Sequence, residues 1–128
     1  MAEKRVLIVD DEPQIREMYA QFFSQSEYTV ETAESAEDAL DLIRKKPFWV
    51  IFLDLNLPGM NGIDLCRLIR KDYPMAIPIA VTGCASLFEL TDCRDAGFED
   101  YFIKPVSLPE LLKVASSAFE KLERWKRR

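Results

Sequence analysis

Three carboxylates, one hydroxyl and one ammonium each follow directly after a short apolar run of this sequence. Asp10 and Asp11 follow the first such run, Asp54 a later one, and Thr82 and Lys104 the last two. Carboxylates brought close together repel one another, and a hard divalent cation such as Mg²⁺ relieves the repulsion. A carboxylate can also act as a nucleophile toward phosphorus while cations and a hydroxyl hold the transferring oxygens. These residue types suit Mg²⁺-dependent phosphoryl transfer, provided that the fold brings them together.

Composition narrows the chemistry further. The chain of 128 residues contains no histidine, which excludes Ser-His-Asp and Cys-His catalysis and every histidine-ligated metal site. Its net charge of -5 argues against an extended nucleic-acid interface. Three cysteines at irregular spacing fit neither a zinc site nor a disulfide framework, so we expect reduced thiols in a cytoplasmic protein. No apolar run is long enough to span a membrane.

Strand patterns and helix patterns alternate five times along the chain. The apolar runs Val6–Val9, Val50–Leu53 and Ile77–Val81 predict buried strands. The stretch Tyr28–Thr32 alternates apolar with polar residues and predicts an edge strand, and Tyr101–Ile103 predicts the last strand. Between these runs, apolar residues recur at helical spacing.

Capping residues mark where the helices begin and end. Pro13 is placed to be the first residue of a helix, and Ser35 is placed to cap the next one. Gly97 is expected to close the fourth helix, and Ser107 with Glu110 forms a capping box before the last.

This alternation predicts one α/β domain over residues 1–128, a doubly wound parallel sheet with helices on both faces. In such a sheet, ligands bind beyond the carboxyl ends of the strands, where the polar residues named above must converge. Asp54 is the natural nucleophile because it lies between the acidic pair Asp10–Asp11 and the pair Thr82 and Lys104.

Four motifs, in order and at matching spacing, resemble the receiver domain of bacterial two-component response regulators. They are Val-Asp-Asp at 9–11, Leu-Asp-Leu-Asn-Leu-Pro-Gly-Met-Asn-Gly at 53–62, Val-Thr-Gly at 81–83 and Asp-Tyr-Phe-Ile-Lys-Pro at 100–105. The resemblance covers essentially the whole chain. It implies a CheY-like, flavodoxin-like (βα)5 fold with strand order 2-1-3-4-5.

The resemblance also implies roles for individual residues. Asp54 would accept a phosphoryl group from a phosphohistidine of a sensor histidine kinase or a phosphotransfer protein. Asp11 and Asp54 would bind Mg²⁺ or Mn²⁺ directly, Asp10 would bind it mostly through water, and the backbone carbonyl of Asn56 would supply a further ligand. Lys104 would contact the phosphoryl oxygens.

A switch is implied as well. Thr82 would hydrogen-bond the phosphoryl group, Tyr101 would turn inward as Thr82 moves, and the peptide bond from Lys104 to Pro105 would be cis. The helix that carries Leu87 and Leu90, the last strand and the last helix would then signal to a target protein, an output domain or a second copy. No direct nucleic-acid or membrane binding is expected.

Three features leave alternatives open. The basic stretch 121–128 is either a solvated helix end or the start of a linker to an output domain. Val106 replaces the phenylalanine common in this family after Lys-Pro, which bears on how the last helix packs. Cys84, two residues after Thr82, offers little help in positioning a hydrolytic water, so we do not expect an unusually short-lived phosphorylated form.

Two rival functions are weighed against a phosphorylated receiver. An aspartate-nucleophile phosphatase typically carries a second aspartate two residues after its nucleophile, where this chain has Asn56. A pseudo-receiver that acts without phosphorylation normally has a broken acidic set, whereas Asp10, Asp11 and Asp54 are all present. Each of these residues alone has an ordinary structural explanation as a helix cap or a surface charge, and it is their combination that favours the receiver.

Overall fold

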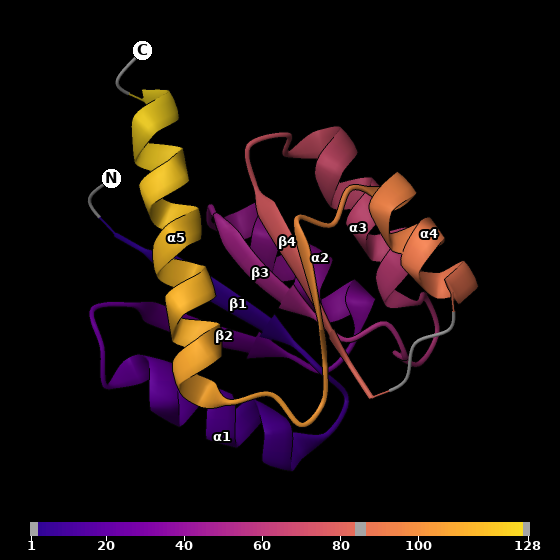
Figure 1. Ribbon diagram of the computed structural model, residues 1–128, viewed down its shortest axis with the longest axis horizontal. Coiled ribbons are helices and arrows are strands. Elements are labelled where there is room, and N and C mark those ends of the chain that lie inside the picture. The colour runs from indigo at the N-terminus through magenta and orange to yellow at the C-terminus, as the bar shows by residue number, and fades with distance from the viewer. Residues whose placement is uncertain (1–2, 84–86, 127–128) are drawn as a thin grey trace.

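Five strands and five helices alternate along the chain in the computed structural model, which describes residues 3–83 and 87–126. All strands are parallel and lie in the order β2-β1-β3-β4-β5 (Figure 1). The predicted fold and strand order are therefore confirmed. The elements are β1 (Arg5–Val9), α1 (Pro13–Ser24), β2 (Thr29–Ala33), α2 (Ala36–Lys45), β3 (Val50–Leu53), α3 (Gly62–Asp72), β4 (Ile77–Thr82), α4 (Leu87–Ala96), β5 (Asp100–Ile103) and α5 (Leu108–Lys126).

Helices cover both faces of the sheet, with α1 and α5 on one side and α2, α3 and α4 on the other (Figure 1). Successive side chains of a strand point to opposite faces, so Val6 packs toward α1 and α5 while Leu7 packs toward α2 and α3. The same alternation separates Phe52 from Ile51 in β3. The inner strands are apolar throughout because both of their faces are buried.

The predicted helix caps are present. Ser35 accepts a hydrogen bond from the backbone N–H of Asp38 (3.1 Å), and Ser107 accepts one from Glu110 (3.1 Å). Gly97 has a φ of 105°, the left-handed conformation that glycine adopts readily at the end of a helix. Val106 packs against the core on the α1 and α5 side. Valine therefore fits at this position, where the family that the sequence resembles commonly has the larger phenylalanine.

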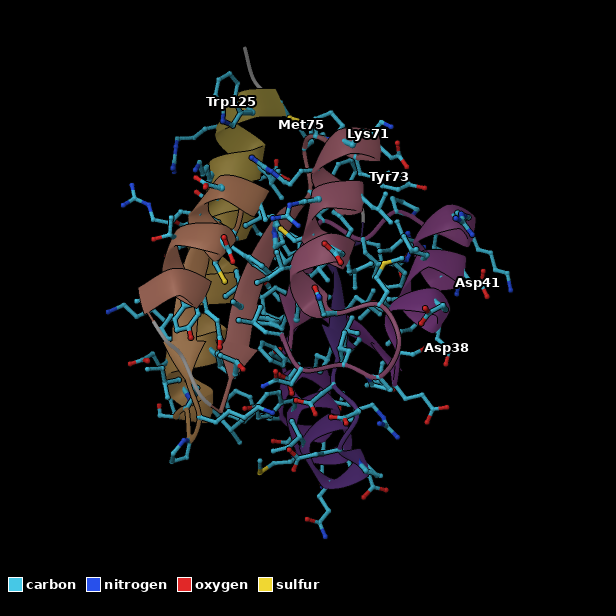
Figure 2. All side chains as sticks on the ribbon, turned by 90° about the vertical axis from the view of Figure 1, so that its right-hand side faces the viewer. Asp38, Asp41, Lys71, Tyr73, Met75 and Trp125 are labelled. Carbon is cyan, nitrogen blue, oxygen red and sulfur yellow. The ribbon has the colours of Figure 1, made fainter. Side chains whose placement is uncertain are left out.

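Edge strand β5 is more exposed than the inner strands of the sheet. Ile103 is 56% exposed, and only the two central residues of β5 are partly buried. Two further exposed apolar side chains, Met75 and Trp125, lie together at the end of the molecule where β4 begins (Figure 2). Over the described ranges, no helix combines the length and the apolar character that a membrane crossing requires.

Two of the three thiols lie in the core. Cys66 and Cys93 are buried, and burial raises the pKa of Cys66 to about 12 and that of Cys93 to about 11. Both therefore stay protonated at neutral pH and behave as small apolar residues, as predicted. Cys84 lies outside the described residues.

Candidate functional site

Backbone hydrogen bonds align the carboxyl ends of the strands and so gather the candidate residues. The N–H of Asp10 donates to Ala33 of β2 (3.1 Å), and the N–H of Asp54 donates to Val9 of β1 (2.9 Å). The N–H of Lys104 donates to the carbonyl of Thr82 (2.8 Å). Each of these residues is therefore held by a neighbouring strand just where its own strand ends.

Lys104 joins the two buried carboxylates. Its Nζ lies 2.7 Å from Oδ2 of Asp10 and 3.1 Å from Oδ2 of Asp54, and its side chain is only 14% exposed. Asp10 and Asp54 are themselves buried. A third carboxylate, Glu12, lies 3.8 Å from the ammonium and is exposed. One cation thus links residues 94 and 50 positions away from it along the chain.

Burial and hydrogen bonding act in opposite directions on these groups. Burial raises the pKa of Asp10, and the hydrogen bonds from Lys104 and from the backbone of Glu12 lower it only in part. Burial lowers the pKa of Lys104, but its bonds to Asp10 and Asp54 outweigh this, so the pKa is raised overall. The ammonium therefore stays charged at neutral pH and balances the carboxylates around it.

Acidic oxygens suited to a hard cation lie on the solvent side of this ion pair. Carboxylate oxygens of Asp10, Asp11 and Glu12 approach within 4.8 Å of one another, with Asp10 buried and the other two exposed. Mg²⁺ is held by few carboxylates and retains water on its open side, so this half-open acidic rim fits it. Glu12 was not among the predicted ligands, although its position directly after the acidic pair could have suggested it.

Replacing Lys104 with methionine should destabilise the metal-free protein by about 3 kcal/mol, because two buried carboxylates lose the cation that they share. Mg²⁺ should then raise the melting temperature of the variant more than that of the wild type, since it replaces the lost positive charge. Thermal unfolding with and without Mg²⁺ measures both effects. Lys71→Met, which changes an exposed lysine (Figure 2), is the matched control. Equal Mg²⁺ responses in variant and wild type would contradict this account of the pair.

The loop after β3 folds tightly around Asp54. The N–H of Asn56 donates to Oδ1 of Asp54 (3.1 Å), so each carboxylate oxygen of Asp54 accepts a hydrogen bond. Gly59 has a φ of 72°, and Asn61 caps α3 by accepting from the N–H of Asp64 (2.9 Å). Gly62 comes so close to the strand that a Cβ there would lie 2.2 Å from the carbonyl oxygen of Asp54.

Thr82 and Tyr101 lie on the other side of Asp54. Thr82 is fully buried, and Nδ2 of Asn56 lies 3.5 Å from its hydroxyl oxygen. Tyr101 packs against the buried cluster of Leu55, Ala80 and Cys93, and its hydroxyl oxygen is buried. The peptide bond from Lys104 to Pro105 is cis, as expected.

A family model for the response regulator receiver domain matches residues 6–116 of this chain. This chain belongs to the response regulator receiver domain family. It is 30% identical over 118 residues to the response regulator protein PilR of Pseudomonas aeruginosa, covering 92% of this chain and 26% of PilR. It is 36% identical over 111 residues to the response regulator MprA of Mycolicibacterium vanbaalenii, covering 84% and 47% of the two chains.

Solved receiver structures agree with this assignment. The crystal structure of a CheY-like response regulator receiver domain protein from Methanospirillum hungatei is 33% identical, with a TM-score of 0.93 over 96% of this chain and 98% of that one. The BeF3-activated DrrB receiver domain is 27% identical, with a TM-score of 0.85 over 92% and 98%. This receiver domain spans less than half of the length of PilR or MprA.

Proposed function

We propose that this receiver domain accepts a phosphoryl group on Asp54 from a phosphohistidine of a sensor histidine kinase or phosphotransfer protein. An oxygen of the Asp54 carboxylate forms the new bond to phosphorus, and the bond from phosphorus to the histidine nitrogen breaks with its electron pair moving to the imidazole. The observation that carries this proposal is the buried contact of Lys104 with both Asp54 and Asp10.

The surrounding residues have complementary roles in this proposal. Asp11 and Asp54 would bind Mg²⁺ or Mn²⁺ directly, with Asp10 acting mostly through water and the carbonyl of Asn56 as a further ligand. A cation held by these residues would supply positive charge for the phosphoryl oxygens. Lys104 contributes a second positive charge, and its contacts with Asp10 and Asp54 place that charge between the two buried carboxylates. The acidic cluster and the burial of Lys104 support this division of the site.

Thr82 and Tyr101 form the proposed switch. Thr82 hydrogen-bonds the phosphoryl group, and Tyr101, whose hydroxyl oxygen is already buried in this structure, keeps its inward position as Thr82 moves, which changes the surface built by α4, β5 and α5. The contact between Asn56 and Thr82 supports this, because it already links the loop after Asp54 to the end of β4. Exposed apolar side chains at Leu90 and Ile103 on that surface suit a protein target or a second copy.

The rest of the proposal concerns the setting of the domain. We place it in the cytoplasm as a single receiver domain over residues 1–128, a phosphoacceptor rather than an enzyme acting on a separate substrate. The greater length of PilR and MprA supports an output domain joined through the basic stretch 121–128. We assign no direct nucleic-acid or membrane contact to the receiver itself.

Incubation with acetyl phosphate and Mg²⁺, followed by intact mass spectrometry, tests the proposed function. We expect one added phosphoryl group, none after chelation of the metal, and recovery on addition of Mn²⁺. If acetyl phosphate adds no phosphoryl group, the experiment is repeated with a phosphorylated histidine kinase as the donor. A protein that binds Mg²⁺ but takes no phosphoryl group from either donor would contradict the proposal, and one that also binds no Mg²⁺ would be a pseudo-receiver.

A further inference from the structure

Arg16 of α1 reaches back to the strand end that carries the acidic pair. Its Nη1 donates to the main-chain carbonyl oxygen of Asp10 at 2.8 Å, and its Nη2 lies 3.9 Å from a carboxylate oxygen of Glu34. The side chain of Arg16 is only 18% exposed, whereas that of Glu34 is largely exposed. The shorter of the two contacts of Arg16 is therefore the hydrogen bond to a backbone oxygen of the site, and the ion pair with Glu34 is the longer one.

This contact completes the restraint of Asp10. Its N–H donates to Ala33 (3.1 Å), and its two carboxylate oxygens accept from the N–H of Glu12 (2.9 Å) and from Nζ of Lys104 (2.7 Å). The carbonyl oxygen accepts from Arg16 (2.8 Å). Every polar group of Asp10 is therefore hydrogen-bonded, and Arg16 supplies the bond that fixes its carbonyl.

The carbonyl of Asp10 belongs to the peptide plane that joins Asp10 to Asp11. Because a peptide unit is planar, fixing this carbonyl also fixes the direction in which the chain enters Asp11. Asp11 is exposed, so the direction of the main chain is what brings its carboxylate toward those of Asp10 and Glu12. Groups that orient metal ligands in this way typically change metal affinity 10- to 100-fold when they are removed.

We propose that Arg16 is a positioning residue that sets the divalent-cation affinity of the site through the acidic rim of Asp10, Asp11 and Glu12, in which Asp10 and Asp11 are proposed ligands and Glu12 is their neighbour. This inference rests on the proposed function for its biological meaning, but cation binding is measured independently of phosphorylation. Two effects of Arg16 oppose each other. Its positive charge repels a bound cation, whereas its hydrogen bond holds the ligands in place. The guanidinium contacts the carbonyl oxygen of Asp10 and a carboxylate oxygen of Glu34. We therefore expect its effect on the position of the ligands to outweigh its repulsion of the cation.

Isothermal titration of the full chain with Mg²⁺ tests the inference. We expect Arg16→Ala to bind Mg²⁺ on the order of 10-fold more weakly than the wild type. Arg16→Lys should recover part of the loss, since its ammonium can still donate to the carbonyl of Asp10. Arg44→Ala removes an exposed arginine of α2, which contacts Asp41 at 3.5 Å, and should leave the affinity unchanged.

The outcomes separate positioning from charge and from stability. Tighter Mg²⁺ binding by Arg16→Ala would show that charge dominates, and unchanged binding with a lower melting temperature would show a purely structural role. Either result overturns the inference. Should Arg16→Ala fail to fold, Arg16→Met takes its place, because methionine keeps an unbranched apolar stem but cannot donate to the carbonyl of Asp10. Wild-type affinity in Arg16→Met overturns the inference, and weaker binding supports it. Weaker Mg²⁺ binding in a protein that no donor phosphorylates would support Arg16 as a positioning residue while contradicting the proposed function.

Discussion

Replacing Asp54 with asparagine is expected to abolish phosphoryl incorporation from acetyl phosphate, to below the detection limit of intact mass spectrometry. The amide has nearly the shape of the carboxylate but is not a nucleophile toward phosphorus. We expect the fold to persist, because the change removes one of two buried carboxylates that share Lys104 and so relieves their repulsion. A melting temperature at or above that of the wild type would show that the loss is chemical.

Asp41→Asn is the matched control for this experiment. Asp41 projects from the outer side of α2 (Figure 2), and its replacement makes the same change in charge without touching the rim. The control should incorporate one phosphoryl group as the wild type does. Peptide mapping of the labelled protein identifies the modified residue. A phosphoryl group found on Asp10 or Asp11 of the Asp54 variant would contradict the assignment of a single nucleophile.

Replacing Gly62 with alanine should destabilise the protein by about 3 kcal/mol, near the upper end of the usual cost of overpacking. The added Cβ would lie 2.2 Å from the carbonyl oxygen of Asp54 and 2.9 Å from Cα of Leu55. Both are backbone atoms of the strand end, so no rotation of a side chain can relieve the clash. The sign of the stability change distinguishes a clash from an ordinary helix position, because alanine in place of glycine within an unobstructed helix stabilises the protein by about 0.5–1 kcal/mol.

Urea unfolding followed by circular dichroism measures this effect. Gly83→Ala is the control, because a Cβ there meets no atom within 4 Å among the described residues, and we expect a change within about 0.5 kcal/mol. An unchanged midpoint for Gly62→Ala would mean that the loop after Asp54 moves freely away from the strand. That result would contradict the tight packing of α3 against the site.

The fold follows from the sequence because three local signals agree. Runs such as Val50–Leu53 are too short and too apolar for surface helices, Ser35 and Ser107 mark helix starts, and Gly97 marks a helix end. The convergence of the polar residues then follows from topology, since parallel strands bring their carboxyl ends to one edge. No knowledge of side-chain contacts was needed for either step.

Side-chain partnerships were less accessible to sequence analysis. Lys104 bridges Asp10 and Asp54 only because of the register between strands that are distant in sequence. The spacing of apolar residues along the sequence does not specify that register. Arg16 could have been suspected, because it lies one helical turn after Glu12 and therefore points back over the acidic pair. The sequence made no prediction of the exposure of Ile103, because a short apolar run looks the same in an edge strand as in a central one.

The hydrogen bonds from Asp10 to β2 and from Asp54 to β1 also determine how the domain responds mechanically. Both carboxylates are mounted on the sheet itself, whose backbone bonds open only with the most extensive unfolding of a domain. If Asp54 is phosphorylated as proposed, we expect the sheet to keep its position because of these backbone hydrogen bonds. Any displacement caused by the added group should then occur in the segments beyond the strand ends.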